Sequence, residues 1–195
     1  ALLMACRYTG RNEVLVPETI SSDRFLQMQN FVRPVASIKT IKMVPDTGLM
    51  DIADLKSKIS INTAAVYFEN PTYLGGIETG AHEIVEIAKS NGALATVGVD
   101  PITLGVISPP SEYGADIVVG DIQPLGIHMY GGGGLGGFIA SNDDPELVAE
   151  YNALLVSIAP GLRPGEFGFD YSTFDRTSYE KRGISPCLLY TSPSP

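Results

Sequence analysis

The apolar and polar residues of the chain follow two alternating periods. Short runs rich in Val, Ile and Ala predict β-strands at residues 14–18, 38–44, 64–68, 94–99, 115–119 and 137–140. Apolar residues at helical spacing and capping residues between these runs predict helices at residues 21–31, 51–59, 77–90 and 144–158. Residues 1–7 are typical of the last turns of a helix that begins upstream and ends at Gly10.

Strands that alternate with helices predict an α/β fold. Because several strands are apolar on both faces, we expect a mainly parallel sheet covered by helices on both sides. Ligands of such sheets bind beyond the carboxyl ends of the strands. Polar residues stand at these ends here, at positions 69–71, 100–101 and 120–123. The pattern therefore predicts a ligand site at this edge of the sheet.

The last residues differ in pattern from the rest of the chain. Residues 187–195 resemble a translated sequencing adapter, and a native tail rich in Pro and Ser is the alternative. We expect residues 185–195 to lie outside the native fold. Residues 1–184 are then expected to form part of one large domain, and the chain to be a fragment of a longer protein.

The composition narrows the classes of function. With 22 acidic and 13 basic residues, the formal net charge of −9 argues against nucleic acid or an anionic membrane as a partner. No apolar run reaches the roughly 20 residues of a membrane span. Two cysteines, Cys6 and Cys187, fit a reducing cytoplasm best. Two unrelated histidines, His82 and His128, indicate no metal site.

Asp100 is a first candidate for chemistry. It follows the apolar strand at residues 94–99, where a carboxylate can pair with a ring nitrogen and keep that nitrogen protonated. The alternative is an aspartate that caps the segment at residues 102–107.

The loop after the strand at residues 115–119 holds the other candidates. They are Gln123, His128, Tyr130, Gly131, Gly132, Gly133 and Gly134. The glycines and Gly137 match G-x-G-x-x-G, but a strand follows them where a dinucleotide site needs a helix. Consecutive glycines either form a flexible loop or let the backbone approach a ligand or another chain closely. Motifs of serine hydrolases and P-loop enzymes are absent from the sequence.

Four motifs occur in an order that resembles one family. They stand at residues 9–19, 68–75, 97–105 and 114–123, and the glycine run follows the last of them. Together they resemble the glycine-cleavage P-protein, in particular subunit 1 of the two-subunit glycine dehydrogenase (decarboxylating). The resemblance covers about residues 1–184.

This resemblance implies the large domain of a fold-type I pyridoxal-phosphate-dependent transferase. The complete cytoplasmic enzyme would decarboxylate glycine and pass the aminomethyl group to the lipoyl arm of H-protein. Pyridoxal phosphate would be anchored by a lysine of the sister subunit, subunit 2, just before a similar glycine-rich loop. Gln123 stands at the corresponding position here, and none of the six lysines lies between residues 90 and 180. An amide forms no Schiff base, so we expect no catalytic residue in this chain.

The resemblance thus predicts a non-catalytic partner subunit. Asp100 matches the position of the aspartate that pairs with the pyridine nitrogen, and Tyr130 with the glycine run is a candidate contact with the sister subunit. One alternative is a stand-alone pyridoxal-phosphate-dependent lyase or transferase, which would need a lysine from chain outside this sequence. Another is a purely structural scaffold that never approaches the substrate.

Overall fold

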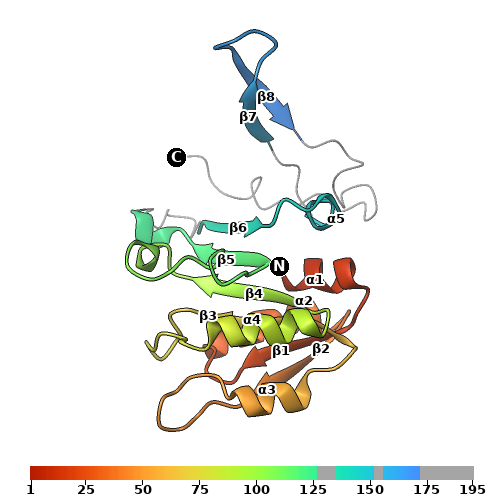
Figure 1. Ribbon diagram of the computed structural model, residues 1–195, viewed down its shortest axis with the longest axis vertical. Coiled ribbons are helices and arrows are strands. Elements are labelled where there is room, and N and C mark those ends of the chain that lie inside the picture. The colour runs from red at the N-terminus through yellow and green to blue at the C-terminus, as the bar shows by residue number, and fades with distance from the viewer. Residues whose placement is uncertain (127–134, 152–155, 172–195) are drawn as a thin grey trace. The chain divides into compact units, whose positions relative to one another are not determined.

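The computed structural model describes residues 1–126, 135–151 and 156–171. The chain divides into two compact units, residues 1–142 and 143–195. In the described part of the first unit, a six-stranded sheet has the order β2-β1-β3-β4-β5-β6 (Figure 1). The second unit contains a short helix and a two-stranded sheet. No helix in the part of the chain that the structure describes is long and apolar enough to cross a membrane.

The first unit is built on a mainly parallel sheet. Neighbouring strands from β2 to β5 pair in parallel, and β6 pairs antiparallel with β5. Every residue of β1 and β3 is buried, as expected for strands covered on both faces. The bounds of the strands are β1 Glu13–Pro17, β2 Ser37–Ile41, β3 Thr63–Glu69, β4 Leu94–Val99, β5 Ile117–Asp121 and β6 Gly137–Ser141. This arrangement confirms the predicted α/β class.

Helices pack on the strands of this sheet. Their bounds are α1 Leu2–Thr9, α2 Ser22–Val32, α3 Ile52–Lys58 and α4 Ala81–Ser90. Leu55 of α3 and Ile84 of α4 join Val66, Phe68 and Val97 of the strands in one buried core cluster. Helix α1 contacts β1, β3 and β4, and α2 contacts β2. Since side chains along a strand alternate between faces, Val66 and Phe68 point away from the face that carries Tyr67.

The predicted helix ends carry the expected capping interactions. Gly10 adopts a left-handed conformation with φ 68° and ends α1. Ser21 Oγ accepts a hydrogen bond from the backbone N–H of Arg24 at the start of α2. Asp51 Oδ1 accepts from the N–H groups of Ala53 and Asp54 at 2.8 and 3.2 Å. These local signals place the ends because each supplies a partner for an otherwise unpaired backbone group.

Strand β2 and helix α4 are shorter than the sequence pattern predicts. Strand β2 ends at Ile41, because Met43 forms an isolated antiparallel bridge with Met50. Helix α4 begins at Ala81, because the preceding turn is held by Glu78, whose Oε1 accepts from the N–H of Gly80. In both cases hydrogen bonds from outside the element end the regular structure.

The helix predicted at residues 144–158 is wrong beyond its first turn. Asp144 caps a helix as expected, but this helix, α5, spans only Pro145–Val148. Strand β7, Val156–Pro160, follows and pairs antiparallel with β8, Phe167–Tyr171. Val and Ile at alternate positions of β7 favour a strand, and pairing with β8 outweighs the helical spacing. The predicted tail at residues 185–195 lies outside the described residues.

Candidate functional site

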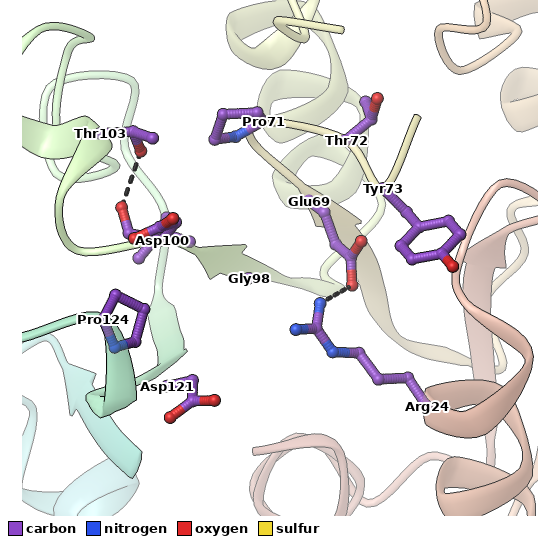
Figure 2. Close-up of a pocket in the computed structure, with 11 residues that line it drawn as sticks. Arg24, Glu69, Pro71, Thr72, Tyr73, Gly98, Asp100, Thr103, Asp121 and Pro124 are labelled. Carbon is purple, nitrogen blue, oxygen red and sulfur yellow. Dashed lines mark hydrogen bonds and ion pairs between the residues drawn. The ribbon is translucent and has the colours of Figure 1, made fainter. Parts of the chain in front are cut away.

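A cavity of about 300 Å³ lies at the carboxyl ends of three parallel strands (Figure 2). In the sheet, β2 lies on one side of β1, whereas β3 and the strands that follow it lie on the other side. The order of the strands therefore reverses between β1 and β3. Ligands of open α/β sheets bind at such reversals. Helix α2, the ends of β3, β4 and β5 and the loops after them line the cavity with Arg24, Glu69, Pro71, Thr72, Tyr73, Gly98, Val99, Asp100, Thr103, Asp121 and Pro124.

Glu69 is the centre of a hydrogen-bond network in this cavity. Its side chain is only 5% exposed. Its Oε1 accepts from Nη1 of Arg24 at 2.6 Å and from the hydroxyl of Tyr67 at 2.9 Å (Figure 2 shows the first of these bonds). The bond to Glu69 raises the pKa of Arg24, and burial, followed by the charge of Glu69, raises that of Tyr67. Tyr67 therefore stays protonated and acts as a donor.

The network depends on a glycine in the neighbouring strand. Glu69 of β3 pairs in register with Gly98 of β4. A Cβ at position 98 would overlap the hydroxyl of Tyr67 and lie 3.3 Å from Cγ of Glu69. The missing side chain thus provides the space in which the tyrosine reaches the carboxylate.

The loop after β3 is held by a second buried carboxylate. Glu78 Oε2 accepts from the N–H of Met50 at 3.0 Å, and the N–H of Glu78 donates to Oδ1 of Asn70 at 3.1 Å. The N–H of Asn70 in turn donates to the carbonyl of Gly98. The peptide bond between Asn70 and Pro71 is cis. The hydrogen bonds of Asn70 and Glu78 fix the start of the segment that carries Pro71, Thr72 and Tyr73 along the cavity.

Asp100 both lines the cavity and caps its own turn. Its Oδ1 accepts from the N–H of Ile102 at 3.0 Å, and its carbonyl accepts from Oγ1 of Thr103 at 2.7 Å. The Asp100 carboxylate thus forms a turn with the backbone two residues on, whereas the 3-10 helix Thr103–Gly105 that follows has Ile102 at its N-cap position and no side-chain cap. Figure 2 also shows the Asp100 side chain beside the cavity, so the same residue faces the candidate ligand space.

Gln123 begins a short 3-10 helix directly after β5. Asp121 Oδ1 accepts from its backbone N–H at 2.8 Å. Both polar atoms of the Gln123 side chain are buried, without a hydrogen-bond partner among the residues that the structure describes. Its neighbours Asp121 and Pro124 line the cavity. Gln123 itself is not among the described residues that line the cavity.

The remaining predicted candidates lie outside the described residues. They are His128, Tyr130, Gly131, Gly132, Gly133 and Gly134. His82 packs edge-on against the ring of Tyr113, with centroids 6.0 Å apart. Burial raises the pKa of the Tyr113 hydroxyl to about 12. Within the described ranges, no cluster of His, Cys, Asp and Glu could hold a metal ion.

Sequence reasoning missed two residues of the network, Arg24 and Tyr67. Arg24 lies in the first turn of α2, directly after the loop that leaves β1. Its position after the first strand was a usable signal, because that loop borders the strand-order reversal. Tyr67 gave no such signal, since it stands within an apolar strand and reads as a core residue.

The residues that line the cavity do not fit pyridoxal phosphate. Such a cofactor needs a lysine for its Schiff base and donors or cations for its phosphate. No lysine is among the described residues that line the cavity. Four lysines form ion pairs elsewhere: Lys39 with Glu13, Lys56 with Glu83, Lys58 with Asp54 and Lys89 with Asp116. Arg24, the one cation in the lining described here, is bonded to Glu69.

The fold is that of fold-type I pyridoxal-phosphate-dependent enzymes. One similar structure is an aspartate aminotransferase mutant of Thermus thermophilus, with a TM-score of 0.50 and 13% identity over 62% of this chain and 36% of that one. Another is an O-acetylhomoserine (thiol)-lyase assigned in Campylobacter jejuni, with a TM-score of 0.53 and 19% identity over 77% and 38%. At such low identity these structures show the fold alone.

The chain belongs to the glycine cleavage system P-protein family, whose model matches residues 1–152. A crystal structure of an inhibitor-bound glycine decarboxylase P-protein is similar with a TM-score of 0.79 and 31% identity, over 100% of this chain and 41% of that one. These comparisons confirm the family resemblance and the predicted fold.

Relatives named probable glycine dehydrogenase (decarboxylating) subunit 1 agree with this assignment. The relative from Staphylothermus marinus is 38% identical over 81% of this chain and 34% of its own length. The relative from Saccharolobus solfataricus is 36% identical over 93% of this chain and 40% of its own length. The chain therefore spans less than half of the relatives that it matches.

Proposed function

We propose that this chain is part of subunit 1 of a two-subunit glycine decarboxylase and acts as the partner that lacks the cofactor lysine. The observation that carries the proposal is the cavity at the cofactor edge of the fold. No lysine lines it among the described residues. Gln123, which has a buried side-chain amide, lies between Asp121 and Pro124 of the lining in the sequence. The subunit 1 names of the relatives support a second subunit as partner.

The cofactor and the substrates belong to the assembled enzyme in this proposal. Pyridoxal phosphate, anchored by the sister subunit, supplies the electron sink for glycine decarboxylation. The lipoyl arm of H-protein accepts the aminomethyl group. The two cysteines of the chain support a cytoplasmic location, and Cys6 is a buried free thiol.

Residues of this chain complete the sister's site in the same proposal. Asp100 and Gln123 follow the ends of β4 and β5, and in this proposal they are the relic of a cofactor pocket that kept its carboxylate and lost its lysine. His128, Tyr130 and the glycines at 131–134 are the proposed contacts with the sister. Glycines suit this role because they let two backbones approach closely.

Reconstitution tests the proposal. The full-length subunit is purified alone and together with the lysine-bearing sister, and the absorbance of lysine-bound cofactor and glycine-dependent exchange of carbon dioxide are recorded. We expect no such absorbance from this subunit alone and no exchange by the sister without it. Cofactor absorbance in the isolated subunit would favour a stand-alone enzyme instead.

A variant of the glycine run distinguishes a subunit that contributes to the shared site from a purely structural scaffold. Gly132→Leu places a bulky side chain in the proposed contact and is expected to lower exchange in the reconstituted pair. Gly168→Leu is the control, since none of the described residues lies within 4 Å of a Cβ at position 168. Unchanged exchange with Gly132→Leu would show that this loop has no role at the shared site.

A further inference from the structure

The cavity at the cofactor edge has an acidic lining. Glu69, Asp100 and Asp121 contribute three carboxylates, and Arg24 is the one cation among the described lining residues. Figure 2 shows these side chains around the same space. Phosphate groups are bound by guanidinium groups, ammonium groups and free N–H and O–H donors. The hydroxyl groups of Thr72, Tyr73 and Thr103 also line the cavity, but they carry no positive charge to offset the three carboxylates. An unpaired cation is the feature that an anionic ligand would need here.

Arg24 is already bound to the carboxylate of Glu69. Its Nη1 donates to Oε1 of Glu69 at 2.6 Å, and the charge of Asp121 also raises the pKa of Arg24. Glu69 is held in turn by Tyr67, whose hydroxyl donates to the same oxygen. A phosphate that entered would have to displace a buried carboxylate from Arg24 while meeting the carboxylates of Asp100 and Asp121.

We propose that Glu69 determines the charge of the ligands that this cavity accepts: by holding Arg24, it excludes phosphate-bearing ligands such as pyridoxal phosphate. The inference rests on the proposed function in one respect, because it takes this cavity as the counterpart of a cofactor site. The inference adds a second reason why the cofactor does not bind to this chain. The missing lysine prevents covalent attachment of the cofactor, whereas Glu69 prevents binding of the phosphate itself.

The test measures ligand binding to the full-length subunit without its sister. Pyridoxal phosphate and inorganic phosphate are titrated by calorimetry, and pyridoxal, which lacks the phosphate, reports binding of the ring alone. Glu69→Gln keeps the size of the side chain and an oxygen for Tyr67, but removes the charge that holds Arg24. We expect it to raise the affinity for both phosphate ligands by about tenfold or more, the effect of one charge-assisted hydrogen bond.

Two further variants assign the effect to particular residues. Glu69→Gln/Arg24→Gln is expected to lose the gained affinity, because the guanidinium that binds phosphate is absent. Glu112→Gln removes an exposed carboxylate outside the cavity and is expected to leave the affinity unchanged. Pyridoxal affinity is expected to change less than pyridoxal phosphate affinity in every variant, because the effect acts on the phosphate.

Several outcomes would overturn the inference. These are tight binding of pyridoxal phosphate by the unmodified subunit, no gain in a Glu69→Gln protein with an unchanged thermal unfolding curve, or a gain that persists without Arg24. If Glu69→Gln does not fold, Glu69→Asp keeps the charge but shortens the side chain by one methylene, which weakens its bond to Arg24 and must raise phosphate affinity. Exchange activity with the sister is measured separately, so a subunit that supports exchange but fails these tests contradicts this inference alone.

Discussion

Gly98 and Tyr67 occupy one space on neighbouring strands. The tyrosine hydroxyl reaches Glu69 only because position 98 has no Cβ, and a Cβ there would lie 3.2 Å from Cζ of Tyr67 and overlap its hydroxyl. The pairing of β3 with β4 therefore decides where the Glu69 carboxylate stands in the cavity.

Gly98→Ala is expected to lower the free energy of unfolding by about 1–3 kcal/mol, the usual cost of overpacking a buried site. Urea unfolding of the variant measures this change. Gly98→Ala/Tyr67→Phe removes the overlapping hydroxyl and is expected to recover part of the loss. Gly105→Ala is the matched control, because a Cβ at position 105 meets nothing within 4 Å in the part of the chain that the structure describes. Equal costs for Gly98→Ala and Gly105→Ala would contradict the crowding seen at position 98.

Glu13 is expected to make the stability depend on pH. Burial raises its pKa, but hydrogen bonds from Lys39, Thr63 and Ser60 outweigh that effect and lower the pKa below the model-compound value of 4.5. The folded form therefore binds this proton less tightly than the unfolded chain does. The contribution is complete above pH 4.5 and is lost as the pH falls through the lowered value.

The measurement compares unfolding free energies of the unmodified protein and Glu13→Gln between about pH 7 and pH 3. Their difference is expected to be largest at neutral pH and to shrink on acidification, because the charged form of Glu13 makes the interactions. Glu112→Gln, at an exposed position, serves as the control. A difference that grows as the pH falls would contradict the assigned direction.

Ile84 is expected to be one of the main contributors to the core of the first unit. It is fully buried between α4 and the sheet. Ile84→Ala should cost about 2–5 kcal/mol of unfolding free energy through lost burial and the cavity left behind. The same substitution at Ile61, which is 81% exposed, should cost within about 0.5 kcal/mol. Similar costs at the two positions would argue against the packing of α4 on the sheet.

The N-cap of α3 is expected to contribute about 1 kcal/mol to stability. Asp51→Ala removes the carboxylate that accepts from the N–H groups of Ala53 and Asp54, leaving these donors to water. Asp46→Ala is the matched control at an exposed loop position. Thermal unfolding of both variants distinguishes a cap from a simple change of net charge, since both lose one negative charge.

The sequence pattern correctly predicted those elements whose formation depends on residues within the same short segment. The strand at residues 94–99 and the capping residue Asp51 stand where the sequence pattern puts them, and the structure selects Ser21 as the cap from three neighbouring candidates at residues 21–23. The prediction of a helix at residues 144–158 is wrong beyond Val148. There the strand β7 depends on pairing with β8, and the spacing of apolar residues within one segment carries no information on such a partner.

The sequence by itself determined the α/β class, the family resemblance and the absence of a lysine from residues 91–180, because motifs, periodicity and residue identity are local properties. It also placed Asp100 and Glu69 at strand ends. Only the tertiary structure decided that Glu69 binds Arg24 and Tyr67. That contact joins α2 to β3, 45 residues apart, and requires the empty space at Gly98. The charge and availability of groups in the cavity therefore follow from packing between distant segments, which no single segment specifies.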